Sequence, residues 1–76
     1  MIFTVEINDV QRPDRCEVEF YLDDEAIRDL IKQLSMFRSK GDHAHFFTSS
    51  WGGNPLTDVK HKESNVLVNH LRITLV

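Results

Sequence analysis

Residues 24 to 39 form the only long stretch of this chain in which apolar side chains recur at helical spacing, and a single helix restricts the possible folds. The apolar stripe consists of Ile27, Leu30, Ile31, Leu34 and Phe37. Acidic residues (Asp23, Asp24, Glu25) precede it and basic residues (Arg38, Lys40) follow it, as the helix dipole favours, and Gly41 is the expected left-handed stop. Because one stripe can cover only one surface, we expect this helix to pack on one face of a sheet.

Four other segments alternate apolar and polar residues, which is typical of half-buried strands. They are residues 2 to 7, 16 to 22, 43 to 49 and 66 to 75, and the last is the most apolar, which predicts a central position in the sheet. We therefore predict an α+β fold with one domain, residues 1–76. Its two layers would be a four-stranded mixed or antiparallel sheet, in the order ββαββ, with one helix on one face.

The sheet face opposite the helix has no predicted cover, so it must meet water or a partner. The predicted alternation places eight polar and aromatic residues on it: Glu17, Glu19, Tyr21, His43, His45, Phe47, His70 and Arg72. A chain of 76 residues also has a thin stability margin. Pairing of two open faces in a homodimer would relieve both problems.

Charge and cysteine content narrow the classes of partner. The net charge is -3, with ten of the twelve acidic residues in the first 42 positions, and no cluster of Lys and Arg that would bind phosphates. This predicts a basic protein partner rather than nucleic acid. A single cysteine, Cys16, and the absence of a secretory signal or an apolar span at the N-terminus predict a cytoplasmic protein that makes no membrane contact.

His43 and His45 have the spacing of two metal ligands on one strand. Alternation points both imidazoles the same way, about 6 to 7 Å apart, and His70 lies on the same predicted face. Three nitrogen ligands with Glu17 or Glu19 nearby would suit a metal-dependent enzyme or a metal-binding protein. The alternative is that these histidines are ordinary polar residues of an open sheet face.

A tryptophan and two glycines open the long connection that precedes the last strand. Trp51 is the only tryptophan of the chain, and Gly52 and Gly53 after it allow conformations that other residues avoid. Trp51 is either an anchor for a partner or a cap on the small core. No phosphate-binding loop or nucleophile motif accompanies it, so we predict no catalytic residues and no cofactor.

Two polar residues in succession, Asn69 and His70, interrupt the apolar run of the last predicted strand. Because strand side chains alternate, one of the two must point toward the helix side. A buried polar group needs a partner, which predicts a bulge here or a hydrogen bond to the loop that starts at residue 50.

The segments His43-Ala44-His45-Phe46-Phe47-Thr48, Ser50-Trp51-Gly52-Gly53, Leu56-Thr57 and Val68-Asn69-His70-Leu71-Arg72-Ile73 resemble the immunity protein 32 family over roughly residues 17 to 75. The resemblance implies a small bacterial α+β protein without catalytic activity or cofactor, which neutralises the toxin of a polymorphic toxin system in the cytoplasm. The Trp-Gly-Gly loop and the Asn-His-Leu-Arg segment depart from the family pattern, which suggests a divergent member.

Together these features predict an immunity-type binding protein rather than an enzyme. The expected partner-binding residues are His43, His45, Phe47, Trp51, Gly52, Gly53, His70 and Arg72. The alternative is a metal-binding protein or metal-dependent enzyme with His43, His45 and His70 as the ligands.

Overall fold

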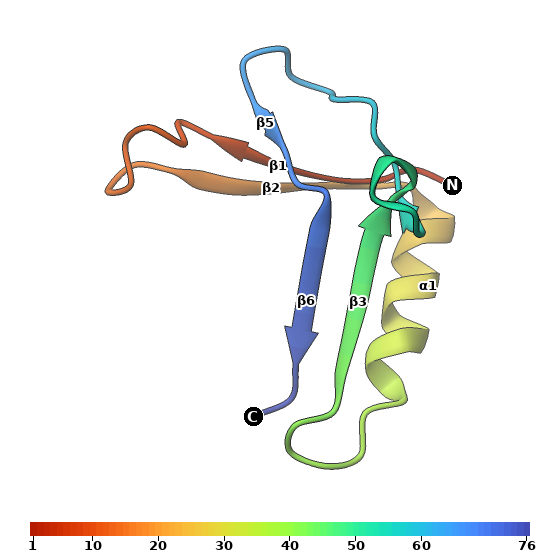
Figure 1. Cartoon of the computed structure of the whole chain (residues 1–76). Helices are drawn as coiled ribbons and strands as arrows, with labels where there is room; N and C mark the ends of the chain where they lie inside the picture. The colour runs from red at the N-terminus through yellow and green to blue at the C-terminus, as the bar shows by residue number, and fades with distance from the viewer.

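A computed structural model describes residues 1–76 and shows an α+β fold with one helix and two three-stranded sheets (Figure 1). The elements are β1 (Phe3–Asn8), β2 (Glu17–Leu22), α1 (Asp24–Ser35), β3 (His43–Thr48), the 3₁₀ turn η1 (Ser49–Trp51), β4 (Pro55–Leu56), β5 (Val66–Leu67) and β6 (His70–Thr74). No helix is long and apolar enough to cross a membrane. Because the strands form two sheets, the predicted single four-stranded sheet is wrong, whereas the α+β class and the helix are confirmed.

The two sheets have the strand orders β2-β1-β5 and β4-β3-β6 and cross one another (Figure 1). In the first sheet, β1 pairs antiparallel with β2, with Val5 opposite Phe20. In the second, β3 pairs antiparallel with β6, with Phe47 opposite His70. Crossing sheets share only part of their faces, so each leaves some of its apolar side uncovered by the other.

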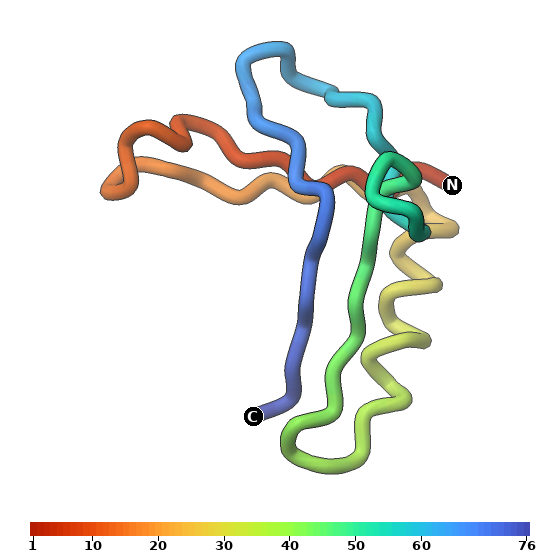
Figure 2. The backbone as a smooth tube through the Cα atoms, in the orientation of Figure 1, coloured from red at the N-terminus to blue at the C-terminus, as the bar shows by residue number.

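The predicted last strand divides into β5 and β6, which belong to different sheets. The Val68 N–H donates to the Val5 carbonyl (2.9 Å), whereas the next carbonyl, of Asn69, accepts from the Thr48 N–H (3.0 Å). The chain therefore passes from one sheet to the other between these residues, as the backbone trace shows (Figure 2). Because β6 borders only β3, it is an edge strand, and the predicted central position is wrong.

Helix α1 begins where the sequence predicts and ends earlier. The Asp23 carboxylate caps it by accepting from the Ala26 N–H (2.9 Å). The last helical residue is Ser35, so Phe37 lies beyond the end. Gly41 does have a positive φ of 97°, but it serves the turn before β3 and is not the helix stop.

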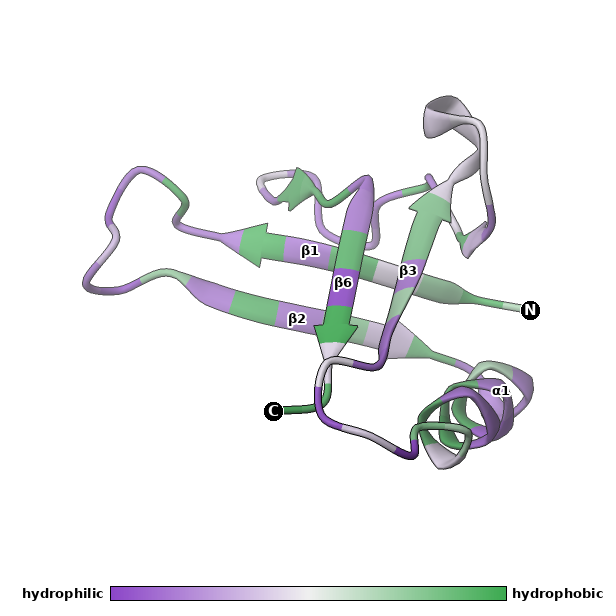
Figure 3. Cartoon of the chain, turned by 60° about the horizontal axis from the view of Figure 1, so that its bottom comes forward, coloured by the Kyte–Doolittle hydropathy of each residue, from purple (hydrophilic) through white to green (hydrophobic).

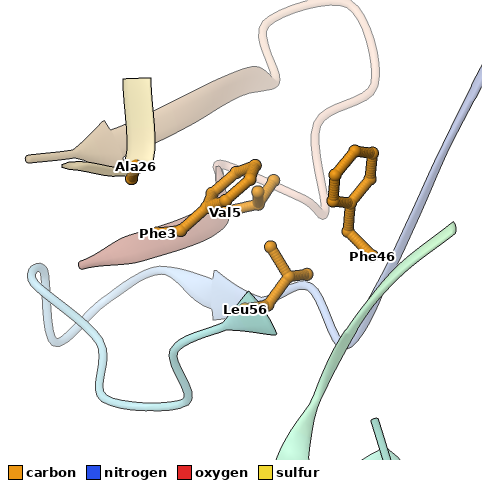
Figure 4. Close-up of a cluster of buried hydrophobic side chains, with 5 residues drawn as sticks. All are labelled: Phe3, Val5, Ala26, Phe46 and Leu56. Atoms are coloured by element: carbon orange, nitrogen blue, oxygen red, sulfur yellow. The ribbon is translucent and has the colours of Figure 1, made fainter. Parts of the chain in front are cut away.

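The core is small and lies where the two sheets and the start of α1 meet (Figure 4). Its buried apolar members are Phe3, Val5, Ala26, Phe46 and Leu56. The Phe3 and Phe46 rings, one from each sheet, are 5.6 Å apart between centroids. These two rings therefore form one of the contacts that join the sheets, beside Leu56 of β4.

A buried carboxylate anchors the long connection between β4 and β5. Glu6 on β1 is fully buried, and it accepts hydrogen bonds from the His61 N–H (2.7 Å), the Lys62 N–H (3.3 Å) and the Asn65 side-chain amide (2.9 Å). Burial alone would raise its pKa, but these bonds outweigh burial and lower the pKa. The connection thus covers the polar side of the β1–β2 pair.

Candidate functional site

Four rings from two strands gather on the outer side of the second sheet. His43, His45 and Phe47 alternate along β3, and His70 on β6 lies directly opposite Phe47. The three histidines are exposed and Phe47 is half-buried, while the intervening Phe46 and Thr48 point to the core and are buried. The predicted alternation of β3 is confirmed, and so is the expectation that His70 lies beside the β3 histidines. We call these four residues, together with Trp51, the ring face.

The rings of this face touch in sequence. The Phe47 and His70 rings stack at 4.4 Å between centroids, and the His45 ring stacks on His70 at 4.9 Å. His43 meets His45 edge-on at 5.0 Å. Side chains held against one another lose little further freedom when a partner binds, so the ring face is preorganised for contact.

His45 and His70 are joined by a hydrogen bond of 2.7 Å between Nδ1 of His45 and Nε2 of His70. Such a bond requires one nitrogen to donate and the other to accept, so at least one of the two rings is neutral when it forms. The pKa of His45 is lowered, first by desolvation and then by the nearby His43, His70 and Arg72. Neutral His45 is therefore favoured in the folded protein.

The geometry offers little to a metal ion. The Nδ1 atom of His43 lies 3.1 Å from the Gly41 carbonyl oxygen, while His45 and His70 face one another. No group of three or more His, Cys, Asp or Glu side chains is arranged to hold a metal. Glu17 and Glu19, the suggested additional ligands, belong to β2 in the other sheet.

Three residues predicted to share the open face with the histidines lie elsewhere. Glu17, Glu19 and Tyr21 belong to a separate sheet, on the side of the β1–β2 pair that carries Glu6 and that the long connection covers. The Tyr21 hydroxyl donates to Glu19 (2.6 Å), which raises the pKa of Tyr21 to about 12 and lowers that of Glu19 to about 2. The Tyr21 ring also stacks on His61 of the long connection. Of the predicted open-face residues, only those from the third and last predicted strands come together.

Trp51, the fifth residue of the ring face, lies in the η1 turn. Its side chain is 60% exposed, and its ring is 6.5 Å from that of His70 between centroids. Trp51 therefore does not cap the core, which was one of the two roles expected from the sequence. Its ring is exposed, as the other role, contact with a partner, requires. Gly52 ends the turn with a φ of 77°, and a Cβ on Gly53 would lie 2.6 Å from the Cβ of Phe47. The two glycines allow this turn to pack closely on β3.

A polar network supports the η1 turn. The sequence indicated this network only indirectly. The Thr48 hydroxyl donates to the Asn69 side-chain oxygen (2.7 Å), and the Ser50 hydroxyl donates to the same atom at 3.3 Å. The predicted hydrogen bond between this polar pair and the loop is thus confirmed for Asn69, and His70 is the exposed member. Arg72 is also exposed and lies opposite His45 in the sheet register, at the rim of the ring face.

The lowered pKa of His45 gives a measurable pH dependence. When the folded pKa of a histidine lies below the unfolded value of about 6.5, the unfolded chain binds the proton first as pH falls, so stability declines below about pH 7. We expect the His45 ring signals to reach half-titration below pH ~6.5 in a two-dimensional NMR titration. In His70→Gln, which removes one of the neighbouring imidazoles, the His45 midpoint should change. A wild-type His45 midpoint at or above about 6.5 would contradict this description.

Comparisons with protein families, with curated proteins and with solved structures give no match to this chain.

Proposed function

We propose that this chain is a binding protein that recognises a protein partner through the ring face, with Arg72, Gly52 and Gly53 at its border. The observation that carries the proposal is the mutually stacked set of two exposed histidines, His45 and His70, and the half-buried Phe47, next to the exposed Trp51. Aromatic side chains and Arg are the residues that most often dominate the energy of protein interfaces.

The chemistry of the ring face favours a protein over a small molecule. The face lies on a pair of strands and its three histidines are exposed rather than enclosed, and imidazoles can both donate and accept hydrogen bonds. A partner with carboxylates or hydroxyls opposite His43 and Arg72, and an apolar pocket for Trp51, would match it. The excess of acid in the first half of the chain would steer a basic partner toward the molecule without forming the contact itself.

We further propose that the partner is a toxin and that the chain acts as an immunity-type protein in the cytoplasm. The support is the resemblance of residues 43 to 57 and 68 to 73 to the immunity protein 32 family, since all five residues of the ring face belong to these segments. An inhibitor of this kind needs a preorganised binding surface and no catalytic group. The ring face provides such a surface, and its residues do not form a catalytic site.

Co-expression with the protein encoded by the adjacent reading frame tests the proposal. That protein alone should arrest growth, and this chain should restore growth. Trp51→Ala should weaken the rescue and raise the Kd of the purified pair about 10-fold to 100-fold, because truncation of an interface anchor costs about 1.4 to 3 kcal/mol. Val59→Ala, at a more exposed position in the connection between β4 and β5, is the matched control and should rescue fully. The absence of growth arrest, or full rescue by both variants with unchanged Kd, would refute the proposal.

A further inference from the structure

Half of the apolar side of α1 is not buried by the rest of the protein. Ala26 is buried and Leu30 packs against the core, but Ile27, Ile31 and Leu34 are exposed, Ile31 to 60%. These three residues are four and three positions apart, so they form one continuous stripe beside the buried one. The expected packing of the helix on a sheet therefore involves only part of its apolar stripe.

Strand β2 has a comparable uncovered surface. Its Phe20 and Val18 lie on the same side of the β1–β2 pair as Phe3 and Val5, opposite Val5 and Ile7 in the register. Phe3 and Val5 are buried by the crossing sheet, whereas Phe20 is 43% and Val18 58% exposed. Figure 3 shows β6 and β3 crossing only part of this pair of strands.

The two uncovered surfaces belong to elements that follow one another in the chain, because β2 ends at Leu22, directly before the Asp23 cap of α1. The flank of α1 that carries Asp29 and Gln33 lines a hollow together with Met1, His45, Phe46, Asn54 and Pro55. By helical spacing, Ile27, Ile31 and Leu34 lie on the other flank of α1, away from this hollow. We call the five residues Val18, Phe20, Ile27, Ile31 and Leu34 the apolar face.

The molecule exposes more surface than a folded monomer of its mass should. Its accessible surface is 5360 Å², whereas a monomer of 8.9 kDa is expected to expose about 4,800 Å². The radius of gyration is 13.1 Å, against about 11.4 Å for a compact chain of this length. The excess of about 550 Å² approaches the ~800 Å² that each partner buries in a standard interface.

The charges of α1 suit a second copy of the same helix. Asp24 and Glu25 lie in its first turn and Lys32 in its last. When the two-fold axis is perpendicular to the helix, the two helices run antiparallel, so the acidic start of each meets the basic end of the other. The two helix dipoles are antiparallel in this arrangement, which is favourable. Ile31 lies between the acidic start and the basic end of α1.

We propose that two copies of the chain associate through the apolar face, with α1 packed antiparallel against α1 of the second copy. This contact differs from the homodimer expected from the sequence, which used the face that carries the histidines. The ring face shares no residue with the apolar face, and its His45 lies toward the Asp29 and Gln33 flank of α1, so a dimer of this kind leaves both ring faces free. The proposal is independent of the partner-binding function.

Sedimentation equilibrium at about 100 µM tests the proposal, and the expected mass is twice 8.9 kDa. Ile31→Glu should raise the dimer dissociation constant at least about 100-fold, since symmetry places two carboxylates in one apolar contact. Met36→Glu is the matched control, because Met36, the C-cap residue of α1, is 63% exposed and lies beside Gln33 on the other flank, and the variant should remain dimeric. Unchanged circular dichroism would show that Ile31→Glu is folded.

A second measurement does not depend on any variant. The Tm of the wild-type chain should rise with protein concentration, because dimerisation stabilises the folded state by mass action. A monomer mass at about 100 µM with a Tm independent of concentration would overturn the proposal. A dimer that Ile31→Glu and Ile27→Glu both leave intact would also overturn it, because the interface would then lie elsewhere.

Discussion

Replacement of Glu6 by alanine is expected to lower the free energy of unfolding by about 3 kcal/mol, measured by urea denaturation at one fixed protein concentration. The carboxylate accepts from two backbone N–H groups and from the Asn65 amide, and all three donors would lose their acceptor together. Asn65 is itself 2% exposed, so water cannot easily replace the lost bond. The connection of residues 57 to 65 should then detach from β1.

Glu17→Ala is the matched control for Glu6→Ala, because Glu17 lies on the same side of the β1–β2 pair but is exposed. It should change stability by less than about 0.5 kcal/mol. The lowered pKa of Glu6 implies stability that is present above pH ~4.3 and lost in acid, so Glu6→Gln should weaken the acid dependence. Equal stability losses for Glu6→Ala and Glu17→Ala would contradict the anchoring role of Glu6.

Phe46→Ala is expected to lower the free energy of unfolding by about 3 to 5 kcal/mol, because it removes one of the two rings that join the sheets. Phe46 is 2% exposed and packs on Phe3. A domain of this size has a total stability of roughly 4 to 11 kcal/mol, so this one change should leave much of the protein unfolded at 37 °C. Circular dichroism during urea unfolding measures it.

Phe47→Ala provides the comparison at the adjacent position. Phe47 is half-buried on the outer side of β3, where it packs on His70 rather than on the core. It should cost less than half as much stability as Phe46→Ala, while it disrupts the ring face. If the two variants lose the same free energy of unfolding, the core does not lie where the structure places it.

The alternation of β3 was predictable because it is a local pattern. Apolar and polar residues alternate from His43 to Thr48, and only one assignment puts Phe46 inside and the histidines outside. The helix was predictable for the same reason. Periodicity identifies the apolar side of an element but not what covers it, which is why the exposure of Ile27 and Ile31 was missed.

Features that depend on distant residues were not predictable. Glu6 occupies a polar position of a half-buried strand, yet it is fully buried because Asn65, 59 residues away, binds it. The division of the last predicted strand had a visible signal in the polar pair Asn69 and His70. The sequence showed that this pair needed a partner, but it did not show that the chain changes sheets there.

The ring face was predicted in part. Residues on β3 and β6 meet because these strands pair, and Trp51 joins them because the η1 turn follows β3 directly. The prediction that Glu17, Glu19 and Tyr21 share this surface failed, since it assumed one sheet. A binding surface inferred from alternation alone is therefore only as good as the assumed strand order.

An NMR titration of the isotope-labelled chain with the protein encoded by the adjacent reading frame tests the proposed binding surface most directly. Backbone amide shifts should concentrate at His43 to Thr48, Ser50 to Gly53 and His70 to Thr74, and Trp51→Ala should reduce them at equal partner concentration. Shifts confined to the Tyr21 and His61 side of the molecule, or no shifts at saturating partner, would contradict the assignment of the ring face as the site of recognition.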